Sequence, residues 1–222
     1  QKAAVWGMDE EYLSSAALDD LECAYSCTQG FLNASESNHI PVLCVFDSEE
    51  VGSASVQGAA SDLLENVLER ICRAMAWELP RMLSQSFMLS ADNAHALHPN
   101  HPELADSANA PLMNGGVVLK FNASQRYTTD GISAAVFRKI CQSAQVDVQT
   151  YCNRADIPGG STLGNISLTH VSVPSADIGL AQLAMHSCYE TAGAKDVAAM
   201  EKALEAYYSA DITVIESGYT LA

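Results

Sequence analysis

The stretch 41-PVLCVFDSEEVGS-53 changes character within a few residues, and it directs both the fold and the chemistry that we expect. Its first half is a continuous apolar run, typical of strands that are covered on both faces. Its second half places two adjacent carboxylates, Glu49 and Glu50, at the end of that predicted strand. Because carboxylates at the end of a core strand are costly without a positive partner, the stretch predicts a cation beside them.

Outward from this stretch, the apolar periodicity predicts helices alternating with strands. Helical spacing covers residues 18–32, 61–75, 128–144 and 196–209. Short apolar runs predict strands at residues 39–46, 86–91, 115–121, 146–152 and 169–179. This alternation indicates an α/β fold with a mostly parallel sheet in α/β/α layers. No linker or repeat divides residues 1–222, and the long irregular segment 92–114 is of the kind that is usually functional.

Composition narrows the possible partners. The 222 residues carry a net charge of −16, with 27 acidic residues against 11 lysines and arginines. This balance argues against binding nucleic acid or an anionic membrane, because phosphate groups need clustered cations. No apolar run is long enough to span a membrane. The seven cysteines are odd in number and scattered, which predicts reduced thiols and therefore a cytoplasmic protein.

Polar residues gather where the predicted strands end. In open α/β sheets, ligands bind at the carboxyl ends of strands. There the sequence places Glu49, Glu50 and Asp92, with His186 after a later strand and Asp19 at the start of the first helix. Four carboxylates in one crevice would repel each other unless divalent cations lay between them. Carboxylates with a histidine suit zinc, manganese or cobalt.

Each of these residues also has an ordinary structural interpretation. Asp19 could cap the helix that it begins. Glu49 and Glu50 could lie in a solvated turn, Asp92 could form an Asx turn, and His186 could be a hydrogen-bonded core histidine. Only the joint pattern favours a metal site.

Six motifs then carry a resemblance to a known family. In order they are "LDD" (18–20), "FDSEEVGS" (46–53), "SADNAHALHPNH" (90–101), "QRYTTDG" (125–131), "IPGGSTLGNI" (157–166) and "LAMHS" (183–187). Their order and spacing resemble those of the aspartyl aminopeptidase family of dinuclear zinc exopeptidases, over residues 1 to about 209. The resemblance implies a three-layer α/β/α metallopeptidase catalytic domain, of the phosphorylase/hydrolase-like kind. The resemblance covers only part of that catalytic domain, because the N-terminal strands and the inserted β-rich oligomerisation domain have no counterpart in this chain.

The resemblance implies a role for each residue of the predicted centre. Asp19 corresponds to the carboxylate that bridges two zinc ions. Glu50 and His186 correspond to ligands of one zinc, and Asp92 to a ligand of the other. Glu49 corresponds to the general base that takes a proton from the attacking water, which fits two-metal hydrolysis.

Further residues are implied in the substrate pocket, namely Lys120, Tyr127, Gly160, Ser161 and Thr162. A lysine there would suit an acidic P1 side chain, although Lys120 by itself reads as an exposed residue at a strand end.

The "HALHPNH" histidines have two interpretations. His95, His98 and His101, spaced by three, look like a zinc cluster, but Pro99 and Pro102 interrupt them. The resemblance instead implies that His95 and His98 support the ligands or lie between subunits.

One departure from the family bears on activity. The family has a histidine ligand well before the bridging aspartate, and the first eighteen residues of this chain contain none. We therefore expect the C-terminal catalytic portion of a zinc aminopeptidase that removes N-terminal Asp or Glu from peptides. It would act with the missing N-terminal part in a homo-oligomer, a dodecamer by family analogy. The alternatives are a non-catalytic metal-binding or assembly fragment and an aminopeptidase of broader, neutral specificity.

Overall fold

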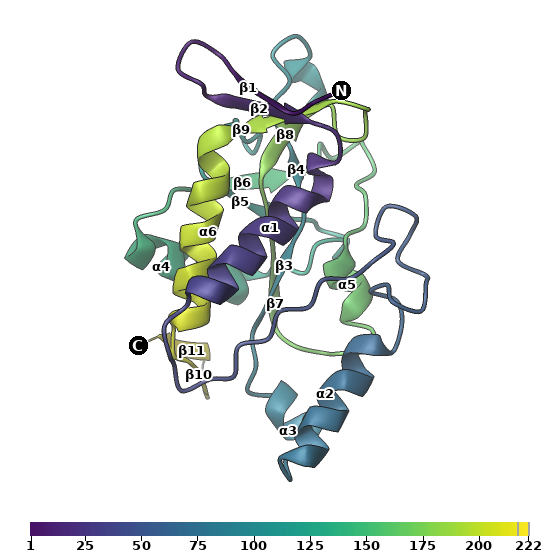
Figure 1. The fold of residues 1–222 in the computed structure, drawn as a ribbon, viewed down its shortest axis with the longest axis vertical. Coiled ribbons are helices and arrows are strands. Elements are labelled where there is room, and N and C mark those ends of the chain that lie inside the picture. The colour runs from purple at the N-terminus through teal and green to yellow at the C-terminus, as the bar shows by residue number, and fades with distance from the viewer. Residues whose placement is uncertain (217, 222) are drawn as a thin grey trace.

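The computed structural model describes residues 1–216 and 218–221, and its helices gather mainly beside one mixed sheet (Figure 1). The helices in this part of the chain are α1 (Leu18–Asn33), α2 (Leu63–Ala74), α3 (Leu79–Leu83), α4 (Gly131–Ala144), α5 (Leu163–Ser167) and α6 (Ala194–Ser209), with a 3₁₀ turn at Pro102–Leu104.

The central sheet has the strand order β3-β7-β5-β6. Its strands are β3 (Met88–Ala91), β5 (Val117–Phe121), β6 (Val148–Cys152) and β7 (Ser175–Gly179). β3 runs parallel to β7 and β5 parallel to β6, but β5 and β7 are antiparallel. The expected mostly parallel sheet is therefore mixed, because β7 enters the sheet from the opposite end to its neighbour β5.

A second sheet, largely antiparallel, has the order β1-β2-β9-β8-β4. Its strands are β1 (Ala4–Trp6), β2 (Tyr12–Ser15), β4 (Ala94–His95), β8 (Ala181–Leu183) and β9 (Glu190–Gly193), and a separate hairpin joins β10 (Ile212–Ile215) to β11 (Gly218–Leu221). The periodicity predicted none of β1, β2 and β9, because three or four residues of mixed polarity leave almost no repeating pattern.

Strand alternation separates the two faces of the central sheet. Successive side chains of a strand point to opposite faces. Val117 and Leu119 of β5 join Ile178 of β7 in one buried cluster, on the side of the helices. The alternate residues, Lys120 of β5 and Asp177 of β7, are also almost completely buried but belong to the opposite face. Lys120, which contacts Asp92, lies on this second face.

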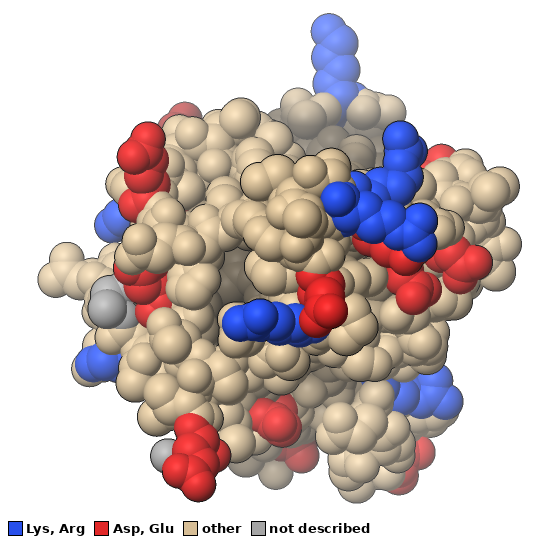
Figure 2. Space-filling model, turned by 90° about the horizontal axis from the view of Figure 1, so that it is seen from below, with Lys and Arg blue, Asp and Glu red and all other residues tan. Residues whose placement is uncertain are grey.

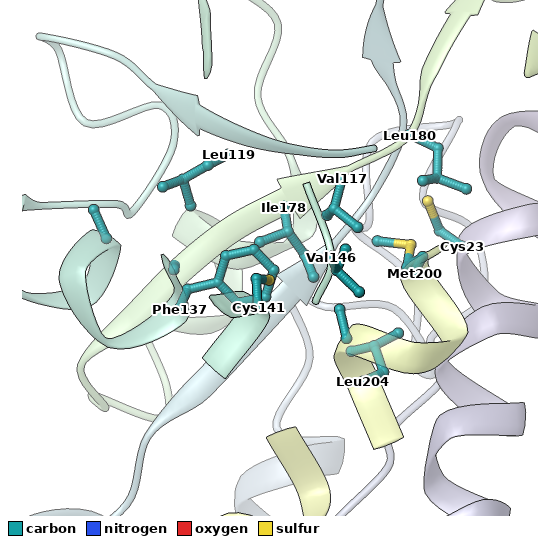
Figure 3. Close-up of a cluster of buried hydrophobic side chains, with 13 residues drawn as sticks. Cys23, Val117, Leu119, Phe137, Cys141, Val146, Ile178, Leu180, Met200 and Leu204 are labelled. Carbon is teal, nitrogen blue, oxygen red and sulfur yellow. The ribbon is translucent and has the colours of Figure 1, made fainter. Parts of the chain in front are cut away.

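The main core lies between the sheet and helices α1, α4 and α6. Figure 3 shows side chains from the three helices converging on the strands. Phe137 of α4 and Met200 of α6 are fully buried there, as is Cys23 of α1. α4 begins where the Asp130 carboxylate accepts hydrogen bonds from the backbone N–H of Ile132 and Ser133, a capping arrangement that stabilises the helix start.

The strand expected at residues 39–46 is not formed. Ile40, Val42 and Val45 are 54%, 46% and 60% exposed, and within residues 1–216 and 218–221 no backbone hydrogen bond involves residues 40–46. The prediction was wrong because an apolar run becomes a strand only when another strand satisfies its backbone groups. Here no described neighbour does so.

A groove of about 780 Å³ separates this segment from the body of the protein. Its walls are formed by residues 38–46, by apolar residues of α2 and α3, and by β3, which is an edge strand of the central sheet. The view from the α2–α3 end shows a recess among uncharged side chains, with basic residues lying beside acidic ones (Figure 2). The apolar face of α2 is half-exposed here at Val67 and Ile71.

The other predicted elements agree closely with the structure. The helix expected at residues 18–32 is α1, although Asp19 and Asp20 have non-helical backbone angles, so the regular helix begins at Leu21. Of the strand expected at residues 169–179, only β7 is formed, and it starts directly after Pro174. All seven cysteines are free thiols. None of the helices in the described residues is long and apolar enough to cross a membrane.

Candidate metal centre

Three of the predicted ligands meet at the amino end of α1. The ligand atoms of Asp19, Glu50 and His186 lie within 4.8 Å of one another. The Nε2 atom of His186 is 2.9 Å from Oδ2 of Asp19 and 3.2 Å from Oε2 of Glu50. These residues come from α1, the turn after residue 46 and the loop after β8, so the tertiary structure assembles the cluster.

Asp19 is the buried member of this cluster. Its side chain is 3% exposed, whereas those of His186 and Glu50 are 61% and 48% exposed. Burial, and then the nearby carboxylates of Asp92 and Glu50, raise the pKa of Asp19 far above its ordinary value. Its second oxygen, Oδ1, is buried and has no hydrogen-bond partner among the described residues. A bound cation stabilises a buried carboxylate that lies among other acids and lacks a hydrogen-bond donor.

The residues therefore fit a divalent metal ion. Two carboxylates and an imidazole lie close together, with Asp19 as the buried member, and this donor set suits zinc. His186 has φ 125°, a backbone conformation that residues other than glycine rarely adopt and that is concentrated at functional sites.

Glu49 and Asp20 lie beside the cluster. Burial, and then the carboxylates of Asp92 and Glu50, raise the pKa of Glu49 to about 7. The same causes raise the pKa of Asp20 to about 6. For Asp20 the sequence predicted no catalytic or metal-binding role, only that it or Asp19 could cap the helix.

Asp92 is held by Lys120 on the second face of the sheet. Nζ of Lys120 lies 3.3 Å from Oδ2 of Asp92 and donates to the backbone oxygens of Asp92 and Asn93 at 3.1 and 3.2 Å. Burial alone would lower the pKa of Lys120, but the Asp92 and Asp177 carboxylates raise it above the ordinary value. Lys120 is 1% exposed, so it is not the exposed strand-end lysine of the alternative interpretation.

The other predicted pocket residues lie near Lys120 or on the loop before α5. The Tyr127 ring centroid is 5.1 Å from Nζ of Lys120, a cation–π distance. Gly160 and Ser161 are exposed, whereas Thr162 is buried.

The histidines of residues 95–101 do not form a zinc cluster with carboxylates in the described part of the chain. The ring centroids of His98 and His101 are 5.2 Å apart, and both side chains are exposed. His95 lies on β4, with its ring centroid 6.3 Å from that of Tyr151.

Two buried acids that were not predicted from the sequence also support the site. Oε2 of Glu190 accepts a hydrogen bond from the backbone N–H of Asp19 at 3.0 Å. Asp177 binds the loops after β5 and before α5. An acid inside the apolar run of residues 169–179 was a usable signal for Asp177, since a charge in a buried strand needs a partner. No local pattern identifies Glu190.

The chain is similar to known proteins over most of its length. A family model described as "Aminopeptidase I zinc metalloprotease (M18)" matches residues 1–208. The chain is 45% identical over 199 residues to a probable M18 family aminopeptidase 2 of Clostridium novyi (strain NT), covering 88% of this chain and 46% of that protein. It is 44% identical over 211 residues to the protein of that name from Mycobacterium leprae (strain TN), covering 94% and 50%.

Solved structures share the fold. The chain matches a protein in the cryo-EM structure of the Ape4 and Nbr1 complex with a TM-score of 0.88 and 36% identity, covering 94% of this chain and 41% of that one. It matches an M18 family aminopeptidase from Thermotoga maritima with a TM-score of 0.86 and 25% identity, covering 94% and 48%. The mApe1 dodecamer of S. cerevisiae matches with a TM-score of 0.81 and 27% identity, covering 94% and 48%. The predicted partial metallopeptidase fold is confirmed, and the chain spans about half the length of the curated relatives it matches.

Proposed function

Because the chain belongs to the M18 family of zinc aminopeptidases, we propose that residues 1–222 form the C-terminal portion of the catalytic domain of such an enzyme. The enzyme removes N-terminal residues from peptides, Asp and Glu before others. The convergence of Asp19, Glu50 and His186 within 4.8 Å carries the proposal.

The metal ligands divide between two positions. Asp19 has one oxygen toward His186 and the other without a hydrogen-bond partner in the described residues, which supports a role in which it would contribute to both positions. Glu50 and His186 would hold one zinc ion, and Asp92 would contribute to the second. Bound zinc supplies acidification of a water molecule and polarisation of the scissile carbonyl. Manganese or cobalt would suit the same donors.

Glu49 is the general base of this proposal. It adjoins the ligand Glu50, and burial together with nearby carboxylates raises its pKa to about 7. A carboxylate with a pKa near the working pH can accept a proton from water and return it to the leaving amine. The adjacent glutamates thus have separate tasks, one binding metal and the other moving a proton.

Lys120 and Tyr127, with residues 160–162, form the proposed substrate pocket. All three hydrogens of the Lys120 ammonium group have acceptors in this structure, on Asp92 and Asn93. To meet an acidic P1 side chain, Lys120 would exchange one of these acceptors for the substrate carboxylate. The charge of Lys120 is the feature that favours acidic substrates in this proposal.

A further polypeptide segment completes the site in our proposal. The apolar groove, the unpaired backbone of residues 40–46 and the free edge of β3 offer it a place, and the relatives have about twice the length of this chain. The segment would supply the histidine that the resemblance implies. His95 and His98, both exposed, would support the ligands or lie at a subunit boundary of a homo-oligomer. A homo-oligomer is proposed because the similar mApe1 of S. cerevisiae is a dodecamer. The seven free thiols suit the reducing cytoplasm.

Zinc binding tests the centre directly. Titrating metal-free chain with zinc in a calorimeter should show tight binding, and His186→Ala should weaken it by more than about 100-fold, since losing even a residue that orients a ligand costs about 10- to 100-fold. His39→Ala is the control, because this exposed histidine faces one carboxylate, that of Asp211, and does not belong to the cluster of Asp19, Glu50 and His186. Equal affinities for the two variants would contradict the assigned centre.

Substrate preference tests the activity. The zinc-loaded protein is assayed with aspartyl, glutamyl and leucyl chromogenic substrates. Faster cleavage of the two acidic substrates is expected. Faster cleavage of the leucyl substrate would favour the neutral-specificity alternative, and tight zinc binding with no cleavage would favour the non-catalytic assembly fragment.

A further inference from the structure

Asp177, in the middle of β7, forms hydrogen bonds to two separate loops and has no role in the proposed chemistry. The residue has 0% exposure and lies on the face of the sheet opposite the helices, where Lys120 also lies. Its two carboxylate oxygens accept hydrogen bonds from two loops that are separate in the sequence.

The first loop follows β5 and contains Tyr127. Oδ2 of Asp177 accepts hydrogen bonds from the backbone N–H of Thr128 and from its hydroxyl, the latter at 2.8 Å. The hydroxyl oxygen of Thr129 accepts from the backbone N–H of Asp177 at 2.8 Å. The two residues after Tyr127 are therefore bound to one strand residue, which limits the positions open to the Tyr127 ring.

The second loop precedes α5 and contains Gly160 to Thr162. The Thr162 hydroxyl donates to Oδ1 of Asp177 at 3.0 Å. Thr162 occupies the N-cap position of α5, where a threonine oxygen commonly accepts from the helix backbone, but it makes no such cap bond. Its hydroxyl is directed at Asp177 instead.

Gly164 allows this close approach of α5 to the sheet. A Cβ atom at this position would lie 2.6 Å from Oγ of Ser90 and 2.8 Å from Oδ1 of Asp177. Any larger residue would push the first turn of α5 away from the carboxylate. The short helix and its preceding loop are thus fitted to β7 around Asp177.

Electrostatics permits a charged Asp177 in this position. An unpaired buried carboxylate is costly, but three hydrogen-bond donors face this one, and the buried Lys120 ammonium lies on the same face. A carboxylate has acceptor sites on both oxygens and no donors, so it can hold both loops at once.

We propose that Asp177 is a positioning residue that ties the loop after Tyr127 and the loop of residues 160–162 to a single strand. Through it, the two sides of the substrate pocket keep a constant separation. This inference rests on the proposed function for the identity of the pocket, but the coupling of the two loops through Asp177 does not depend on activity.

Thr162→Val and Thr162→Ser provide the test, since valine has the shape of threonine without a hydroxyl and serine keeps the hydroxyl. In hydrogen exchange on the full zinc-loaded chain, Thr162→Val should speed exchange at residues 160–168 about fivefold, as expected for one lost hydrogen bond. A smaller increase should occur at residues 126–130. Thr162→Ser should exchange like the parent protein.

A double-mutant cycle with Thr128→Val tests whether the two loops are coupled through Asp177 or are loosened independently of each other. The effects of the two valine substitutions on exchange should be non-additive, because both donors meet the same carboxylate. Additive effects, no change at residues 126–130, or failure of serine to restore the parent behaviour would each overturn the proposal.

Kinetics adds a readout that a purely structural role would not move. In the active zinc enzyme, Thr128→Val, which removes a donor to Asp177 at a residue outside the proposed pocket, should raise KM with little change in kcat, and Thr128→Ser should restore KM. A fall in kcat alone would contradict positioning of the pocket. If exchange shows the coupling and no peptidase activity exists, the proposed function fails while the role of Asp177 stands.

Discussion

Replacing Glu22 with glutamine should remove a pH-dependent loss of stability that this one carboxyl group imposes. Glu22 lies on α1, is 6% exposed and accepts a hydrogen bond from Asn93, while its second oxygen is buried without a partner. Burial raises the pKa of Glu22 to about 7, against the lowering effect of the Asn93 hydrogen bond, and the acids Asp196 and Glu190 raise it further.

The direction follows from proton binding. Between the ordinary pKa of 4.5 and the folded value of about 7, the folded chain keeps the proton on Glu22 while the unfolded chain has lost it. Stability from this group is therefore fully present below pH 4.5 and is lost as pH rises to 7. From pH 5.5 to 8 the loss is about 2 kcal/mol, at about 1.4 kcal/mol for each pH unit below the folded pKa. A glutamine side chain does not titrate, so the Glu22→Gln variant escapes this loss.

Urea denaturation of the parent and Glu22→Gln proteins at pH 5.5 and pH 8, both without metal, measures the effect. The free energy of unfolding of the variant, relative to that of the parent, should be about 2 kcal/mol higher at pH 8 than at pH 5.5, so the variant gains relative stability. Exposed Glu205 on α6 provides the control, and Glu205→Gln should show no such change. Parallel pH profiles for the parent and Glu22→Gln would refute the reasoning.

Three further substitutions test the base, the core and the close approach of α5. Glu49→Gln should abolish peptide cleavage while elemental analysis finds the bound zinc unchanged, and loss of zinc would mean that Glu49 and Glu50 have exchanged roles. Phe137→Ala should lower the unfolding free energy by about 3–5 kcal/mol in urea, because the ring has 0% exposure, and a loss below about 1 kcal/mol would contradict this packing. Gly164→Ala should destabilise by about 1–3 kcal/mol in the same assay, whereas Gly160→Ala, whose added Cβ meets nothing within 4 Å, should be nearly neutral.

Local patterns predicted most of the regular elements. Helical periodicity placed α1, α4 and α6 within a few residues of their bounds, since each helix is long enough to show a repeating apolar face. Runs of apolar residues likewise identified β3, β5 and β6. The short strands of the second sheet escaped prediction, because they are defined by pairing between distant segments rather than by their own residues.

The candidate site was likewise predicted only in part from the sequence. Residue types and motifs selected Asp19, Glu50 and His186, and the structure places their ligand atoms within 4.8 Å. The roles of Glu49 as base and Asp92 as ligand of a second zinc stay predictions. For Lys120 the residue alone indicated an exposed strand end, whereas the alternation of β5 and the position of Asp92 bury it.

Motifs and periodicity depend on neighbouring residues, so the family, the long helices and the acids and histidine that could bind metal were all predictable from the chain alone. Three features could be found only in the folded molecule: residues 40–46 lack strand pairing within the described residues, Lys120 is buried against Asp92, and Asp177 joins two loops. Strand pairing and the burial of a charge depend on partners far away in the chain, and Asp19 meets His186 across 167 residues. The apolar run that precedes Glu49 and Glu50 met the requirement of a strand in composition, but a strand also needs a neighbour, and none of the described residues provides one.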